Sequence, residues 1–431
     1  MRTSLIFVTL LVILPPVANA QKASSRLGGI SQSKTLTLVE ALRLAESSSP
    51  LLQAKQAEIT AAQGAAVDAR ALLFNNPQLS LERTRRQVPQ PDLQTERRNE
   101  WRAGISQVFE IAGQAGYRRD ASSAAQSTLQ LGLEETRLKV RSDAAEQFFR
   151  VLGLQQRIEI ERQAGVLFDS TASAVEKRRL AGEDTRLDAN VALVEAERAR
   201  NQLAVVQEQL LDARGELAIR LQLPPSDLVV AEGELAPSSL PYSRERLVEA
   251  AQSQPRLRGL ALREESAVAK LRLEQASVYP DVTVGLSVGR EGSVDARERL
   301  TALSVSVPLP LFKRNATGIG LASSELTQVR TERLAAERES SVRISVLWSK
   351  LESLNARVRR LRDSVLLPLQ SNETLAGKSR SAGQIGLLEL IVVNRQSLDA
   401  RRDLIDALVD YQSTRLALEL AAGWSPDGQK Q

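Results

Sequence analysis

The fold of this chain is decided by Pro280–Leu311, which reads PDVTVGLSVGREGSVDARERLTALSVSVPLPL. Two runs in it alternate between apolar residues and small or polar ones, and a charged segment from Arg290 to Arg299 separates them. The apolar positions are Val282, Val284, Leu286, Val288, Leu303, Val305, Val307 and Leu309. A strict period of two marks strands whose two faces meet different environments. The stretch therefore predicts a β-hairpin over about 281–310.

A second hairpin is predicted earlier in the chain, over about 78–111. Its first strand is Gln78–Arg86, with Leu79 and Leu81 on one face, and its loop is Gln87–Asp92. Its second strand is Glu100–Ile111. The apolar face of that strand holds Trp101, Ala103, Ile105 and Phe109. The same alternation therefore occurs in both halves of the chain.

Each predicted strand is roughly 9–11 residues long, the length that a tilted strand needs to cross a bilayer. A single hairpin of this kind is more often a soluble one packed on helices, but two equivalent hairpins in an exported chain favour membrane strands. Four strands do not close a barrel, which needs about eight, and an open sheet edge is not viable in lipid. The chain is therefore predicted to oligomerise, and three copies would supply about twelve strands.

Three short motifs recur 201 to 205 positions further on, which indicates an internal duplication. The pairs are Ser49-Pro50 with Gln254-Pro255, Asn76-Pro77 with Tyr279-Pro280, and Arg179–Glu183 with Arg380–Gln384. A period of this length is too long for a solenoid. We predict a first repeat at 21–225, a linker at 226–242, a second repeat at 243–424 and a C-terminal tail at 425–431.

Helices dominate the rest of the sequence. Only 3% of the residues are aromatic, a composition typical of long helices that pack along narrow seams. Long helices are predicted at 116–180, 185–221, 317–381 and 387–422, so each hairpin is followed by two helices that turn at an Ala-Gly dipeptide. One apolar seam in the first comprises Leu129, Leu133, Thr136, Val140, Ala144, Phe148 and Val151. A helix of about 60 residues reaches roughly 90 Å, enough to cross much of a periplasm.

Shorter helices precede the first hairpin. After a polar lead-in over Gln21–Lys34, Thr37 and Glu40 have the spacing of a capping box at a helix start. A second helix is predicted from Pro50 to Phe74, because Pro77 prevents continuation.

The N-terminus resembles a secretory signal. Arg2 is followed by the apolar run Leu5–Leu14 and by the small-residue cleavage site Ala18-Asn19-Ala20. Residues 1–20 are therefore predicted to be a signal peptide. We expect the product in the periplasm or the outer membrane.

The composition argues against an enzyme. The chain has no Cys and no His, which removes the thiol nucleophile and the commonest general base. No catalytic, cofactor-binding or metal-binding residue is predicted, and Gly28-Gly29 lacks the strand and helix that flank a phosphate loop. The net charge of +5 comes from charges that alternate in sign along helices, so nucleic-acid binding is not predicted.

Four stretches together resemble the TolC family of outer-membrane efflux channels over nearly the whole mature sequence. They are Thr37–Leu42 before Ser49-Pro50, Pro280–Val284, Val305–Asn315, and Gly383–Gln396 with Leu387-Leu388-Glu389-Leu390. Val305–Asn315, which reads VSVPLPLFKRN, is similar to the family's heavy-metal (CzcC-like) branch.

The resemblance implies a fold that is mostly α with a small membrane β part. It implies a homotrimer whose twelve-stranded barrel in outer-membrane lipid continues into a long α-helical barrel through the periplasm of a Gram-negative cell. It also implies two partners, a periplasmic adaptor and an inner-membrane pump of the resistance-nodulation-division type. The chain is then a passive exit duct without cofactors, and its branch of the family points to divalent heavy-metal cations as the cargo.

The resemblance also indicates site residues. The tips of the helical hairpins would meet the adaptor, which points to Arg179, Leu180, Gly182, Arg380, Ala382 and Gly383. Glu389 lies where family channels carry an acidic pore ring, whereas Val392, one turn later, is not acidic. Many relatives carry a lipidated Cys that is missing here, so we expect the barrel alone to hold the protein in the membrane.

Two alternatives remain open from sequence. Within the family, the channel could serve drug efflux or type I protein secretion, because a passive duct recognises its cargo weakly. From another class, the chain could be a periplasmic coiled-coil scaffold with both hairpins packed on helices.

Overall fold

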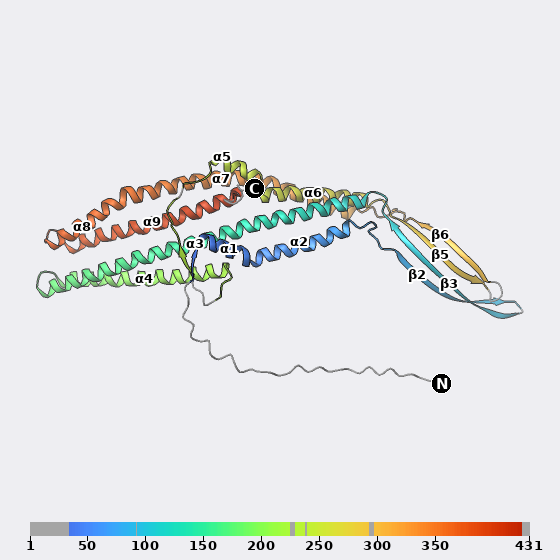
Figure 1. The fold of residues 1–431 in the computed structure, drawn as a ribbon, viewed down its shortest axis with the longest axis horizontal. Helices are drawn as coiled ribbons and strands as arrows, with labels where there is room; N and C mark the ends of the chain where they lie inside the picture. The colour runs from blue at the N-terminus through green and yellow to red at the C-terminus, as the bar shows by residue number, and fades with distance from the viewer. Residues whose placement is uncertain (1–33, 92, 225–228, 238, 293–296, 425–431) are drawn as a thin grey trace, which may run out of the picture.

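The computed structural model describes residues 34–91, 93–224, 229–237, 239–292 and 297–424. The molecule is elongated, with a β-sheet at one end and long helices running away from it (Figure 1). The predicted signal peptide and most of the polar lead-in and the tail lie outside the described residues. In the described part of the chain, none of the helices is both long and apolar enough to cross a membrane.

The sheet confirms the two predicted hairpins. β2 (Gln78–Gln90), β3 (Leu93–Phe109), β5 (Val282–Gly292) and β6 (Arg297–Ser306) form one antiparallel sheet in the order β2-β3-β5-β6. The two hairpins therefore lie side by side, joined through β3 and β5.

Both predicted hairpin loops are too long. β2 and β3 stay paired through most of the predicted first loop, and Arg290 pairs with Arg299, at the two ends of the predicted second loop. Strand pairing depends on the backbone, so charged side chains that remain exposed do not end it. At the other end β6 stops at Ser306, before the predicted Val307–Leu309, because Pro308 and Pro310 cannot donate to the ladder.

The sheet has two distinct faces. The outer face is defined as the one that carries Val282, Val284, Leu286 and Val288, and the register places Leu79, Leu81, Ile105, Leu303 and Val305 on it. Leu79, Leu81 and Leu303 are each at least 74% exposed. The inner face carries small residues: an added Cβ at Gly104 would lie 2.9 Å from the Ser80 hydroxyl. One face is thus apolar and exposed, and the other is lined by small and polar groups.

Ten helical segments surround the long axis in the described residues. They are α1 (Leu38–Ser48), α2 (Pro50–Ala69), α3 (Gln114–Leu180), α4 (Arg186–Arg220), α5 (Arg244–Gln252), α6 (Pro255–Ala276), α7 (Ala316–Arg359), η1 (Arg360–Leu366), α8 (Leu367–Ser381) and α9 (Leu387–Ala422). The Thr37–Glu40 capping box is confirmed at the start of α1. The apolar seam of α3 is fully buried only at Ala144, Phe148 and Val151.

Two helix predictions are wrong in detail. α2 ends at Ala69 instead of Phe74, since Phe74 stacks on the Arg118 guanidinium at 3.6 Å and the Asn75 carbonyl accepts a hydrogen bond from Gln107. The predicted helix 317–381 is interrupted by the π-helical segment η1. Pro368, in the first turn of α8, lacks the N–H that a regular helix would use there, and the wider π turns accommodate it.

A small second sheet was not predicted. β1 (Lys34–Thr37) pairs in parallel with β4 (Val229–Glu232), which lies in the predicted linker. Leu36, Val229 and Ala231 are buried against Phe148 and Leu217 in one core cluster. β4 is thus packed against α3 and α4.

Candidate functional site: the helical tips and the ion pairs between the hairpins

The two tips have the same backbone geometry. Gly182 and Gly383 adopt φ of +81° and +71°, the left-handed region that glycine enters without strain. In each turn the residue after the glycine donates its N–H to a carbonyl five residues back: Glu183 to Arg178, and Gln384 to Ser379, both at 2.8 Å. These are Schellman motifs, and they satisfy carbonyls that a helix end leaves unpaired.

An ion pair joins the two tips. The Arg380 guanidinium donates to both carboxylate oxygens of Asp184 at 2.8 Å, and the side chain of Asp184 is only 6% exposed. Arg178 donates to the same carboxylate at 3.1 Å. Asp184 therefore holds an arginine from each hairpin. Arg380 makes both contacts through one nitrogen, Nη2, and charge-assisted hydrogen bonds of this kind are stronger than neutral ones.

Two further ion pairs connect α9 to the first hairpin. Arg395 donates to Glu195 of α4 through two nitrogens, one of them at 2.9 Å. Arg402 donates through two nitrogens to Glu161 of α3, which is fully buried and also accepts from Arg157 at 2.9 Å. With the tip pair, they connect the two hairpins at three levels along the long helices.

Glu389 lies in the first turn of α9, at the position that Asp188 occupies in α4. Asp188 completes a capping box with Thr185, and the hydroxyl and N–H of Thr185 hold the pKa of Asp188 below its ordinary value. The N-cap of α9 is instead Gly386, which has no side chain to engage Glu389. Among the described residues Glu389 is exposed and makes no hydrogen bond or ion pair. Its carboxylate lies over the start of the helix, where Oε2 would be 2.5 Å from a Cβ added at Gly386.

The remaining predicted tip residues lie at the surface. Leu180 is 73% exposed, and Gly182, Ala382 and Gly383 are also exposed. Arg179 forms a local pair with Glu176 at 2.7 Å. The structure therefore brings the predicted residues together at one end of the molecule, remote from the sheet (Figure 1). Sequence reasoning missed Asp184, Glu161 and Glu195, because nothing in their local pattern distinguishes them from solvated helix carboxylates.

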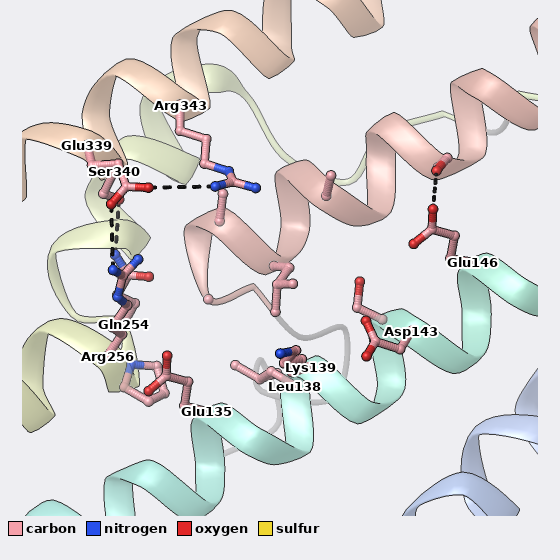
Figure 2. A pocket seen from close by; sticks show the side chains of 17 residues that line it. Glu135, Leu138, Lys139, Asp143, Glu146, Gln254, Arg256, Glu339, Ser340 and Arg343 are labelled. Carbon is pink, nitrogen blue, oxygen red and sulfur yellow. Dashed lines mark hydrogen bonds and ion pairs between the residues drawn. The ribbon is translucent and has the colours of Figure 1, made fainter. Parts of the chain in front are cut away.

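A cavity of about 350 Å³ lies where α3, α6, α7 and α9 meet (Figure 2). Glu339 pairs with Arg256 at 3.5 Å and with Arg343 at 3.7 Å. Across the cavity Ser413 donates to Glu146 at 3.0 Å. These lining groups bond to one another, so the cavity is explained as a gap at the junction of the helices.

The chain combines a sheet that has an exposed apolar face with long helical hairpins, an architecture typical of a component of an outer-membrane channel. The chain belongs to the family described as Outer membrane efflux protein, whose model matches residues 41–219 and 247–424.

Particular relatives agree with this family. The chain is 25% identical over 382 residues to the cobalt-zinc-cadmium resistance protein CzcC of Cupriavidus metallidurans, covering 87% of this chain and 85% of that protein. Its fold is similar to that of the outer membrane protein VceC from Vibrio cholerae, with a TM-score of 0.76 and 19% identity over 90% of this chain and 96% of that one. It is also similar to CusC, with a TM-score of 0.75 and 16% identity over 90% and 92% of the two chains.

Family membership confirms the predicted class of function. The protein is an outer-membrane efflux channel that extends into the periplasm, and its family provides transport ducts, not enzymes. Channels of this family work with adaptor proteins and resistance-nodulation-division pumps in tripartite efflux. This membership sets aside the periplasmic scaffold.

Proposed function

We propose that this chain is the outer-membrane exit duct of a tripartite system that expels divalent heavy-metal cations. The observation that carries the proposal is its 25% identity to the cobalt-zinc-cadmium resistance protein across 87% of the chain. Similarity over nearly the whole length favours a shared role over a shared local motif. The alternative cargoes, drugs or a secreted protein, would be served by the same architecture.

The duct is proposed to be a homotrimer with a twelve-stranded barrel. Two observations support it: β2 and β6 are the free edges of the sheet, and the outer face exposes leucine and valine side chains along its length. An apolar face is suited to lipid, whereas a free sheet edge in lipid leaves backbone N–H and C=O groups unpaired and therefore requires a partner strand. Pairing β6 of one copy with β2 of the next would close three sheets into one barrel.

The internal duplication and its domain limits are part of the proposal. One family model matches the chain twice, at 41–219 and 247–424, and both matches end with a helical hairpin. Repeats at 21–225 and 243–424, with a linker at 226–242, are compatible with this division. The predicted signal peptide at 1–20 and the tail at 425–431 complete the domain organisation.

The tips are proposed to dock a periplasmic adaptor, which links the duct to the inner-membrane pump. Leu180, Leu187 and Leu388 are each at least 63% exposed beside the glycine turns. Exposed apolar side chains gathered at one end of a molecule are typical of a protein interface. In the trimer, Glu389 of each chain would contribute to an acidic ring at the aperture.

Deletion of the gene tests the cargo. Growth of the deletion strain would be compared on zinc, cobalt, cadmium, nickel and copper salts and on a panel of dyes and antibiotics, with the wild-type gene on a plasmid as control. Selective metal sensitivity that the plasmid reverses is expected. Selective drug sensitivity would contradict the cargo and leave the duct in place.

A further inference from the structure

Along the strands, the side chains on the outer face of the sheet change from apolar residues to arginines. Across the sheet, Arg83 lies opposite Trp101, Trp101 opposite Arg290, and Arg290 opposite Arg299. This row is the next one beyond the row that contains Leu81 and Val288. The following positions on the same face are Arg85, Asn99 and Arg297, and then Arg97. Arg83, Arg85, Arg97, Arg290, Arg297 and Arg299 are together named the arginine belt.

The arginines of the belt and the carboxylates of the sheet lie on opposite faces. The sheet carboxylates within the described residues all lie on the inner face, by register: Glu82, Glu96, Glu100, Glu291 and Glu298. There they pair with inner-face arginines: Arg98 with Glu96 at 2.8 Å, Arg102 with Glu291 at 3.0 Å, and Arg86 with Glu100 at 3.7 Å. The six belt arginines are all exposed and form no ion pair with any described residue.

The belt contains a direct like-charge pair. Arg290 and Arg299 are cross-strand partners, and like charges directly opposite each other destabilise a sheet. The corresponding inner-face pair, Arg86 opposite Arg98, is neutralised by Glu100 and Glu96. The outer pair thus has no counter-charge among the described residues, and its guanidinium groups are exposed to whatever anion lies outside the sheet.

The level of the belt along the barrel axis indicates which anionic groups it would meet. The C-terminal ends of β2 and β5 lie at the end of the sheet remote from the helices, which extend into the periplasm (Figure 1). Arg290 is eight residues along β5 from Val282. At about 3.3 Å per residue and a tilt of about 40°, this is roughly 20 Å of bilayer thickness, close to the outer edge of a barrel's apolar band. Trp101, in the same row, is typical of the aromatic girdle at that interface.

We propose that the arginine belt binds the phosphate groups of the phosphorylated glycolipid of the outer leaflet, lipopolysaccharide. The planar guanidinium fork matches a phosphate in two-point hydrogen bonds, which distinguishes arginine from other cations at such a surface. Bound phosphates would neutralise the Arg290–Arg299 pair and hold lipid around the barrel. This inference rests on the proposed function, because it requires the sheet to stand in the outer membrane as part of a barrel.

The experiment measures binding of purified lipid A to the detergent-solubilised full-length protein by tryptophan fluorescence, and Trp101→Phe identifies the reporting side chain. Wild-type protein is titrated with lipid A that keeps both phosphates and with dephosphorylated lipid A. We expect the phosphorylated form to bind about tenfold more tightly, because charge-assisted bonds to phosphate are the strong ones. Equal affinity for the two lipids would overturn the proposal, and this comparison needs no belt variant to fold.

A matched pair of double variants locates the site. Arg290→Gln with Arg299→Gln removes the outer cross-strand pair, whereas Arg86→Gln with Arg98→Gln removes the inner one. The outer variant is expected to bind phosphorylated lipid A about tenfold more weakly, and the inner variant to change affinity by less than about twofold. Equal losses in both variants would refute a specific outer site.

Two further measurements distinguish a lipid site from a small-anion site, and failure of this inference from failure of the proposed function. Inorganic phosphate alone, at millimolar concentration, should not displace lipid A; complete displacement would show a small-anion site and contradict a lipid surface. Conductance in phosphatidylcholine bilayers reports the duct independently. A conducting channel without preference for phosphorylated lipid ends this inference only, whereas lipid binding without conductance ends the proposed function.

Discussion

The fully buried carboxylate of Glu161 allows the sharpest test of how the two helical hairpins hold together. It accepts hydrogen bonds from Arg402 of α9 and from Arg157 of its own helix. Arg402→Met keeps an apolar stem of similar length and removes the cation that comes from the second hairpin. The carboxylate then remains buried with Arg157 as its ion-pair partner.

The expected loss follows from the burial. Breaking a buried ion pair by removing one partner costs about 3–5 kcal/mol, and the retained Arg157 favours the lower end, about 3 kcal/mol. An unfolding entropy of about 2.1 cal/mol/K per residue gives roughly 0.9 kcal/mol/K for 431 residues. Arg402→Met should therefore lower Tm by about 3 °C.

Circular dichroism at 222 nm, recorded at one fixed scan rate in detergent, measures the shift. Arg162→Met is the matched control, because Arg162 pairs with Glu159 on the same helix as Glu161 but both side chains are more than half exposed. An exposed pair contributes about 0–1 kcal/mol, so the control should move Tm by about 1 °C or less. Equal shifts for the two variants would refute the claim that this pair joins the hairpins.

Three further predictions concern the tip, the acid response and the pore. Gly383→Ala should lower the local stability of the tip by about 1 kcal/mol, because φ is +71° there, and amide hydrogen exchange at the tip should become faster. Gly132→Ala is the control: Gly132 lies in an open position on α3, so alanine there should slow exchange around it. Burial raises the pKa of Glu419 despite its hydrogen bond from Tyr242, so the folded state holds the carboxyl proton more tightly than the unfolded state does. The stability of the wild type should therefore fall relative to that of Glu419→Gln as pH rises from about 4 to 7. Parallel pH profiles of the two proteins in thermal melts would contradict this. Glu389→Gln should weaken block of single channels by divalent cations in planar bilayers, and unchanged block and conductance would remove the acidic ring.

Much of the fold was predictable because its signals are local. The alternation around Val284 and Val305 predicts strands, since period two is a property of the strand itself. Ala-Gly turns at Gly182 and Gly383 predict the tips for an equally local reason, the left-handed backbone that glycine adopts readily. Where local signals compete, prediction failed. The charged residues from Arg290 to Arg299 indicate a loop, yet strand pairing continues as far as Gly292 and Arg297 because the partner strand is already aligned.

The location of the candidate site could be predicted from the sequence, but the ion-pair partners of its residues could not. The exposure of Leu180 and Gly182 follows from their position at a helix turn. The partner of Arg380 could not be derived in this way, since Asp184 is one of several acidic residues near the first tip. The interruption at η1 was also missed, although Pro368 provided a signal for it.

By itself the sequence determined the periods, the turns and the two-sided character of the strands, because each of these depends on residues within a few positions of one another. Only the tertiary structure decided which charges meet. Arg402 and Glu161 are 241 residues apart, and their contact depends on the rotation of α9 about its axis when it packs on α3. The same holds for the sheet, where the register between strands places the belt arginines on one face and their potential partners on the other.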